Sequence, residues 1–179
     1  MGRFSMTGGC GGTKSFLALF LASAVLVGCG GGAEPPPDTT VDLSLIATSD
    51  LNPDAQGRPS PVNVRIFELT SEDPFRVTTY YDLRDEPEDT LGPTAISMRE
   101  TVVNPGTAFQ RTFEVEDTAR VIALAADYQD IENAIWRAYI PIRTGETNRL
   151  QGDLRAGEVT LILTRPQEQD SWWDTLSPF

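Results

Sequence analysis

The side chains that most often carry catalysis are scarce in this sequence. Its 179 residues contain no histidine and only two cysteines. Without histidine there can be no Ser-His-Asp triad, no Cys-His pair, no HExxH zinc site and no haem with a proximal histidine. Two cysteines cannot supply the four thiolates of a structural zinc site. We therefore expect no enzymatic activity, no catalytic residue, no metal ion and no cofactor.

Carboxylates are the one reactive group that the chain holds in excess, with 26 Asp and Glu residues against 14 Lys and Arg. The resulting net charge of −12 argues against nucleic acid as a partner, because phosphate binding needs a basic surface. The densest acidic run lies between Asp82 and Asp89, where it could suggest a calcium site. The run lacks the spacing and the glycine of an EF-hand loop, so we interpret it as a solvated acidic loop. A glycosidase would need a defined pair of carboxylates, and the sequence identifies none.

Cys29 is the cysteine whose surroundings indicate a modification. It follows a basic start and an apolar run from Phe16 to Val27, the pattern of a secretory signal peptide. An uncleaved anchor is the alternative, but the run is shorter than the roughly 20 apolar residues of a membrane-spanning helix. The order Leu-Val-Gly-Cys at residues 26–29 resembles the bacterial lipobox, in which the cysteine is lipidated and becomes the first mature residue. We therefore predict a signal peptide at residues 1–28 and lipidation of Cys29.

Cleavage before Cys29 changes the charge and the thiol content of the mature chain. Arg3 and Lys14 are lost, so the net charge falls from −12 to −14. Cys10 is lost as well, so no disulfide can form. Gly30 stands where an aspartate would typically retain a lipoprotein in the inner membrane, and we expect an outer-membrane anchor with the protein facing the periplasm. Residues 29–40 then form a tether, since glycines are flexible and consecutive prolines are stiff and extended.

Residues 41–165 form the folded body, in which apolar and polar residues mostly alternate. Alternation of this kind indicates half-buried strands. About eight short strands in one domain favour an all-β antiparallel sandwich. The segment 120–128 is apolar on both faces, so we expect it to be a central strand, and the segment 61–69 also has apolar residues on both faces. The expected strands are 41–45, 61–69, 95–103, 109–115, 120–128, 135–142, 148–154 and 158–164, and a Pro105-Gly106 turn separates the third from the fourth.

Two segments depart from the strand pattern. Residues 71–83 begin with a helix start signal at Ser71 to Pro74 and repeat apolar residues at helical spacing. We expect one short helix there, inserted between strands and covering one edge of a sheet. Residues 166–179 form a separate tail with Trp172 and Trp173, for which partner binding, folding back onto the domain and disorder all remain open.

The loop at residues 51–61 is the strongest candidate for recognition. It joins the first two strands, is far longer than a hairpin needs and contains three prolines. A rigid, polar, exposed loop loses little entropy when it binds a partner. A crossover between two sheets, stiffened for stability, explains the same residues equally well.

The segment from Leu51 to Leu69, LNPDAQGRPSPVNVRIFEL, resembles the TssJ (SciN) family of type VI secretion lipoproteins. The resemblance runs from Cys29 to about Thr164 and does not extend to the tail. It implies a transthyretin-like β-sandwich of eight strands with a helical insertion and no enzymatic activity. The other similar segments are Phe75, Tyr80–Leu83, Arg99–Glu100 leading to Pro105–Gly106, and Ala125–Tyr128 followed by Ile135–Arg137.

The resemblance also implies a partner. Members of that family capture the periplasmic C-terminal region of TssM, an inner-membrane protein, and so tie the secretion complex to the outer membrane. We therefore expect TssM and other type VI membrane-complex subunits as partners. The alternative is a free-standing lipoprotein that binds a small ligand or carbohydrate, or acts as an inhibitor.

The family uses the loop between the first two strands for this contact. Arg58 is the leading contact residue, because a guanidinium can pair with a carboxylate through two hydrogen bonds. The net charge of the mature chain leads us to expect a basic or neutral docking face on TssM. The expected contact residues are Asn52, Pro53, Asp54, Ala55, Gln56, Gly57, Arg58, Pro59, Ser60 and Pro61.

Overall fold

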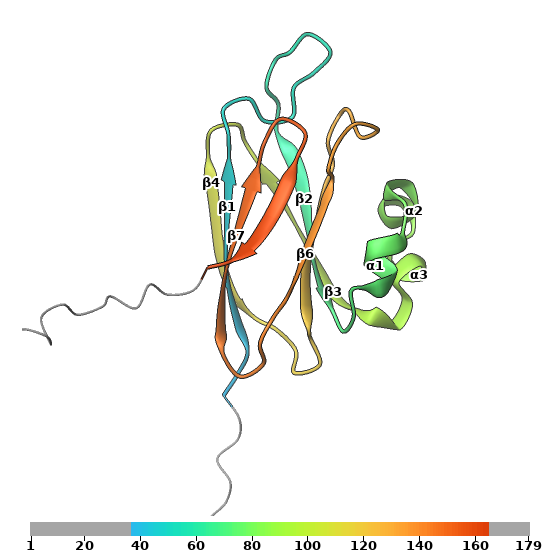
Figure 1. Ribbon diagram of the computed structural model, residues 1–179, viewed down its shortest axis with the longest axis vertical. Helices are drawn as coiled ribbons and strands as arrows, with labels where there is room; N and C mark the ends of the chain where they lie inside the picture. The colour runs from blue at the N-terminus through green and yellow to red at the C-terminus, as the bar shows by residue number, and fades with distance from the viewer. Residues whose placement is uncertain (1–36, 165–179) are drawn as a thin grey trace, which may run out of the picture. The chain divides into compact units, whose positions relative to one another are not determined.

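A computed structural model describes residues 37–164, which form two four-stranded sheets (Figure 1). Sheet A has the strand order β4-β1-β7-β8, and sheet B has the order β3-β2-β5-β6. Every pair of neighbours is antiparallel except β1 and β7, which are parallel. The prediction of an all-β sandwich with a helical insertion is confirmed. The strands are β1 (Thr40–Ala47), β2 (Val62–Leu69), β3 (Ala95–Val103), β4 (Ala108–Glu114), β5 (Val121–Ala126), β6 (Arg137–Pro141), β7 (Thr147–Leu154) and β8 (Val159–Leu163).

The main core lies between the two sheets and follows from the alternation in the sequence. Val41, Leu43 and Leu45 of β1 point into it, whereas the residues between them are only half-buried. From sheet B, Ile122 and Leu124 of β5 enter the same core and are fully buried. Because successive side chains of a strand point to opposite faces, one face of each sheet is sealed against the other sheet.

A second core lies on the outer face of sheet B, against the helical insertion. Strand β5 is buried at all six positions, which confirms the prediction of a central strand covered on both sides. Ala123 and Ala125 are small and let the insertion approach the sheet closely. The other members of this core are Phe67, Leu69 and Val121 from the sheet and Phe75, Leu83 and Leu91 from the insertion.

The prediction of one helix at the edge of a sheet is wrong in two respects. The insertion contains three short helices, α1 (Asp73–Val77), α2 (Tyr80–Asp85) and α3 (Pro87–Leu91), followed by the 3-10 turn η1 (Gly92–Thr94). They cover the face of sheet B. Thr79 separates the first two because its extended backbone begins a new helix, in which its hydroxyl accepts a hydrogen bond from the Asp82 N–H. The acidic run that we interpreted as a loop therefore lies in α2 and α3, with Pro87 beginning the latter.

The Pro105-Gly106 turn forms as expected, but it joins strands of different sheets. Gly106 has a φ of 71°, and the Thr107 N–H donates to the Asn104 carbonyl at 3.2 Å, as in a tight turn. Strand β3 pairs with β2 in sheet B, whereas β4 pairs with β1 in sheet A. The local turn signal was correct, but pairing partners depend on residues far away in the sequence.

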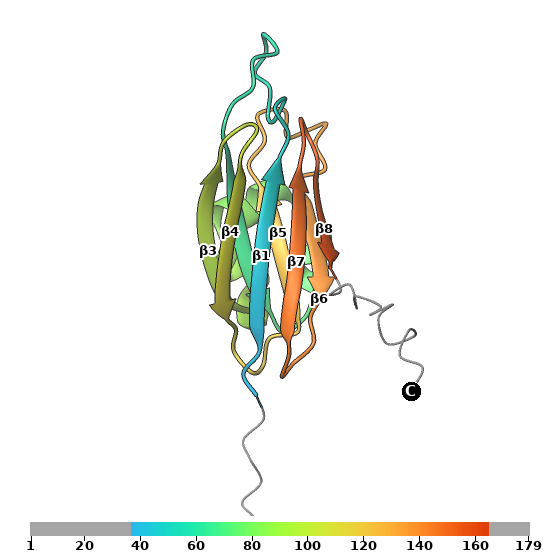
Figure 2. The same ribbon diagram turned by 90° about the vertical axis from the view of Figure 1, so that its left-hand side faces the viewer.

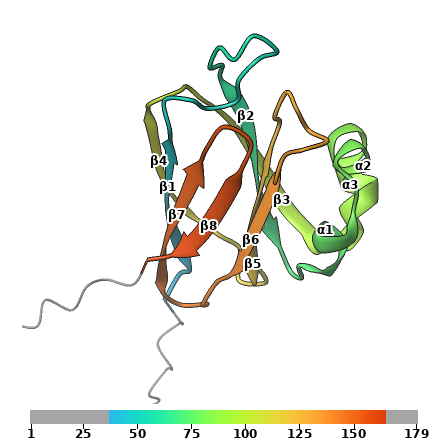
Figure 3. The same ribbon diagram turned by 45° about the horizontal axis from the view of Figure 1, so that its top comes forward.

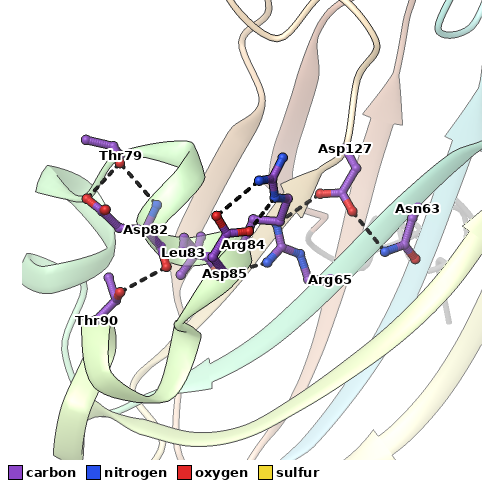
Figure 4. A network of polar contacts seen from close by, with 9 residues as sticks. All are labelled: Asn63, Arg65, Thr79, Asp82, Leu83, Arg84, Asp85, Thr90 and Asp127. Carbon is purple, nitrogen blue, oxygen red and sulfur yellow. Dashed lines mark hydrogen bonds and ion pairs between the residues drawn. The ribbon is translucent and has the colours of Figure 1, made fainter.

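A buried arginine connects the insertion to sheet B (Figure 4). Arg65 of β2 is 3% exposed; its Nη1 donates to the Leu83 carbonyl of α2 at 2.8 Å and its Nη2 to Asp127 Oδ1 at 2.9 Å. Asn63 Nδ2 donates to the other oxygen of Asp127 at 3.0 Å. Asp127 follows strand β5 directly, so this network fixes both the insertion and the start of the β5–β6 loop.

The first described residues and the β1–β2 loop lie at opposite ends of the sandwich (Figure 2). Strand β1 begins at one end, next to the β6–β7 turn, where the Thr40 N–H donates to the Glu146 carbonyl at 3.1 Å. The β1–β2 loop projects from the other end. The predicted signal peptide, Cys29 and the aromatic tail at 166–179 lie outside the described residues, as does most of the tether.

Candidate functional site

Four loops meet at the end of the sandwich that carries the predicted recognition loop (Figure 3). They are the β1–β2, β3–β4, β5–β6 and β7–β8 connections. Backbone hydrogen bonds join them: Gly106 N–H donates to Thr48 O at 3.0 Å, Asn52 N–H to Ala156 O at 3.0 Å, and Ile135 N–H to Gly157 O at 2.9 Å. The loops therefore form one continuous surface.

Asn52 is the residue that holds the base of the β1–β2 loop. It is 3% exposed and has a φ of 47°, a conformation that asparagine tolerates better than most side chains. Its Nδ2 donates to the Pro61 carbonyl at 2.8 Å, which closes the two ends of the loop on each other. Its Oδ1 accepts the Gln129 N–H at 2.8 Å, which ties the loop to the β5–β6 connection.

The tip of the loop closes on Asp54. Its Oδ1 accepts the backbone N–H groups of Gln56 and Arg58, both at 2.9 Å. The Gly57 N–H donates to the Asp54 carbonyl at 2.8 Å, and Gly57 has a φ of 76°, which glycine adopts without strain. The tip is therefore ordered by its own hydrogen bonds, in agreement with the prediction of a rigid loop.

Arg58, the expected leading contact, already has a partner within the loop. Its Nε and its Nη2 each lie 2.7 Å from Asp54 Oδ2, while the side chain remains 77% exposed. The Arg58 guanidinium holds the pKa of the Asp54 carboxyl below its ordinary value of 3.8. The Nε and Nη2 edge of the guanidinium is thus engaged, and the surface offered to a partner is an ion pair more than a free cation.

The other predicted contact residues divide into a base and a tip. Asn52 is buried, Pro53, Asp54 and Ser60 are half-buried, and the remaining residues of the loop are exposed. The loop joins sheet A to sheet B, so it is also the stiffened crossover that we considered as the alternative. The base of the loop carries the bonds to the other loops, whereas the bonds of the tip stay within the loop, so the crossover leaves the tip exposed for recognition. The exposed residues are Ala55, Gln56, Gly57, Arg58, Pro59 and Pro61.

Sequence reasoning missed the contribution of the β5–β6 loop. Gln129 supports the β1–β2 loop twice, because its N–H binds Asn52 and its Nε2 donates to Ser60 Oγ at 2.6 Å. No local motif marks Gln129. Its position just after the buried strand β5, which is antiparallel to β2, would have placed it at the end where β2 begins.

A cavity of about 200 Å³ opens beneath the β1–β2 loop. Tyr128 lies in its wall and is 4% exposed, and burial raises the pKa of its phenol above the ordinary value of 10.0. The Tyr128 hydroxyl has no hydrogen-bond partner among the described residues. The residues around the cavity are Asn52, Pro53, Tyr128, Asp130, Asn133, Ala134, Ala156 and Gly157.

Within residues 37–164 there is no group of three or more metal-ligating Cys, Asp or Glu side chains. The helices of that part of the chain are also too short and too polar to cross a membrane. The four loops instead offer hydrogen-bonding groups and charge. They carry six acidic side chains and two arginines, one of which is the engaged Arg58. Such a surface suits a protein partner with basic or neutral groups.

Comparison with known proteins gives consistent matches. The family model described as type VI secretion lipoprotein (VasD, EvfM, TssJ) matches residues 39–157. The T6SS lipoprotein TssJ1 from Pseudomonas aeruginosa is 27% identical with a TM-score of 0.70, over 73% of this chain and 99% of that chain. No curated protein matches the chain.

Two further solved structures share the fold. Serratia marcescens Lip, a membrane-bound component of the type VI secretion system, is 19% identical with a TM-score of 0.65, over 74% of this chain and 99% of that chain. A chain in a structure described as the T6SS protein TssM C-terminal domain from EAEC is 20% identical with a TM-score of 0.54, over 71% of this chain and 98% of that chain.

Proposed function

The chain belongs to the type VI secretion lipoprotein family, and on that premise we propose that it holds the periplasmic C-terminal domain of TssM at the outer membrane. It is a structural lipoprotein of the secretion system's membrane complex and not an enzyme. Its β1–β2 loop, residues 52–61, would make the contact with TssM.

The observation that carries the proposal is the preformed β1–β2 loop at the end of the sandwich opposite the start of strand β1 (Figure 1). Asn52 closes its base, and Asp54 closes its tip. A preformed loop keeps most of its binding energy because little chain entropy is lost on association. An anchor at one end and a rigid loop at the other suit a protein that must reach from a membrane toward a partner.

Replacing residues 54–59 by a glycine-serine segment of the same length tests the contact. We expect the full chain, purified in detergent, to lose at least about 100-fold in affinity for the periplasmic domain of TssM, as expected when several interface anchors are lost together. The melting temperature should stay near that of the parent, because the replaced residues lie outside both cores. Affinity is measured by biolayer interferometry.

The matched control replaces residues 116–118 in the same way, by a glycine-serine segment of equal length. These residues form an exposed segment at the other end of the sandwich. This variant should bind TssM like the parent. Parent-like binding by the variant changed at residues 54–59 would show that the loop is not the contact.

Cys29 is the proposed lipid attachment point, at the head of a tether formed by residues 29–40. A lipid chain contributes about 0.8 kcal/mol of membrane-binding free energy per buried methylene, and several chains together give durable anchoring. Cys29→Ala should therefore move the protein from the outer-membrane fraction to the soluble periplasmic fraction, as judged by cell fractionation and immunoblotting. Cys10→Ala is the control, since that residue precedes the cleavage site, and it should fractionate like the parent. Retention of the Cys29→Ala protein in the outer membrane would refute the assignment.

A further inference from the structure

We infer that a basic side chain of TssM, an arginine or a lysine, enters the cavity beneath the β1–β2 loop. The inference rests on the proposed function for the identity of the partner. It adds a second point of contact, which is built from the β5–β6 and β7–β8 loops. The predicted contact residues, in contrast, all lie in the β1–β2 loop.

The dimensions and walls of the cavity suit one long side chain. Its volume is about 200 Å³, and three loops that are hydrogen-bonded to one another line it and leave one side open to solvent. Pro53, Ala134 and Ala156 provide apolar wall. Arginine and lysine bury their methylene stems against apolar surface of this kind while the charged group stays near polar atoms.

The charge around the cavity selects a cation. Asp130 is exposed at the cavity and forms no ion pair with any described residue. Within residues 37–164 its two carboxylate oxygens accept only from Asn133 Nδ2, at 2.9 and 3.0 Å. A neutral amide leaves most of the carboxylate charge unbalanced, so a partner's cation would gain by pairing with it.

The unpaired Tyr128 hydroxyl is an independent feature of the same cavity. Buried polar groups in folded proteins nearly always have a hydrogen-bond partner. No hydrogen bond of ordinary geometry joins this buried hydroxyl to a described residue, although the Arg155 backbone N–H lies near it and Tyr128 forms part of the cavity wall. A guanidinium or an ammonium carries several donors and no acceptor, so it would pair with Asp130 directly, while the shielded phenol oxygen adds a second acceptor behind the cavity wall.

Two variants of the full chain test the inference through binding to the periplasmic domain of TssM. Ala156→Leu fills the cavity without changing charge, and we expect it to weaken binding by at least about 30-fold, the loss typical of a blocked interface anchor. Asp130→Asn removes the charge at nearly constant shape, and we expect a loss of about 10-fold. The Asp130→Asn variant should also show weaker salt dependence than the parent.

The matched charge control is Asp117→Asn, an exposed carboxylate in the β4–β5 loop at the far end of the sandwich. It should bind like the parent, and melting temperatures of all variants verify folding. Parent-like binding by both cavity variants, while the exchange of residues 54–59 still abolishes binding, would overturn this inference and leave the proposed function standing. A loss with Ala156→Leu but none with Asp130→Asn would overturn the assignment of a cation. A parent that does not bind TssM would remove the proposed function itself.

Discussion

Replacing Arg65 by leucine should lower the free energy of unfolding by about 3 kcal/mol, the lower end of the usual cost of breaking a buried ion pair from one side, because Asp127 is partly exposed. The change leaves Asp127 without its cation and the Leu83 carbonyl of α2 without its donor. Water cannot reach the buried Leu83 carbonyl without opening the contact between the insertion and sheet B, whereas the Asp127 side chain is 24% exposed and can bind water. Urea denaturation measures the loss.

Arg84→Leu is the matched control, since Arg84 is an arginine of the same insertion (Figure 4). It pairs with Asp85, but the two side chains are 46% and 58% exposed. An exposed pair of this kind contributes less than about 1 kcal/mol. Hydrogen exchange should show residues 73–94 opening in the Arg65 variant and staying protected in the Arg84 variant. Equal losses of stability in the two variants would contradict the role assigned to Arg65.

Asn52→Ala should remove about 3 kcal/mol from the free energy of unfolding and weaken binding to TssM. Two buried hydrogen bonds disappear, those to the Pro61 carbonyl and from the Gln129 N–H, and each contributes about 1 kcal/mol. Alanine at a φ of 47° adds a backbone cost of about 1 kcal/mol. The base of the loop then opens, so its tip is no longer presented in one conformation.

Asn52→Gly separates these contributions because glycine accepts the positive φ but makes neither hydrogen bond. The free energy of unfolding of the Asn52→Gly variant should be about 1 kcal/mol higher than that of the Asn52→Ala variant. The two variants should weaken TssM binding to a similar degree, because both release the base of the loop. A variant that loses stability but keeps parental affinity would show that the conformation of the loop does not matter for the contact.

The hydrogen bonds of Arg65 and those of Asn52 both act on the β5–β6 loop. Arg65 binds Asp127 at the end of strand β5, and Gln129, two residues later, binds Asn52. On the other side of Asp130, Glu132 accepts a hydrogen bond from the Tyr81 hydroxyl of α2 at 3.0 Å. The helical insertion therefore supports the β5–β6 loop, and that loop supports the proposed TssM contact. We expect the insertion to stabilise the binding end although it lies on the side of the sandwich.

Much of the candidate site could be predicted from the sequence because it is local. The prolines of the β1–β2 loop and the glycine at position 57 act within a few residues, so the pattern of residue types was sufficient to predict a rigid exposed loop. The lipobox is equally local, and it motivates the assignment of Cys29. The cavity was not predictable, since its residues come from three loops that are separated by up to about a hundred positions.

The sequence by itself determined the number of strands, the faces of β2 and β5 that are buried, and the existence of an insertion. These features follow from the alternation of side chains along a strand and from helix start signals, both of which act over short distances. Only the tertiary structure decided that β3 and β4 belong to different sheets, that the insertion forms three helices over a face, and that Arg58 is already paired. It also decided that Gln129 supports a loop 77 positions away. Strand pairing and packing depend on which segments, distant in the sequence, bury their apolar surfaces against each other. The local repeat of apolar residues does not contain that information.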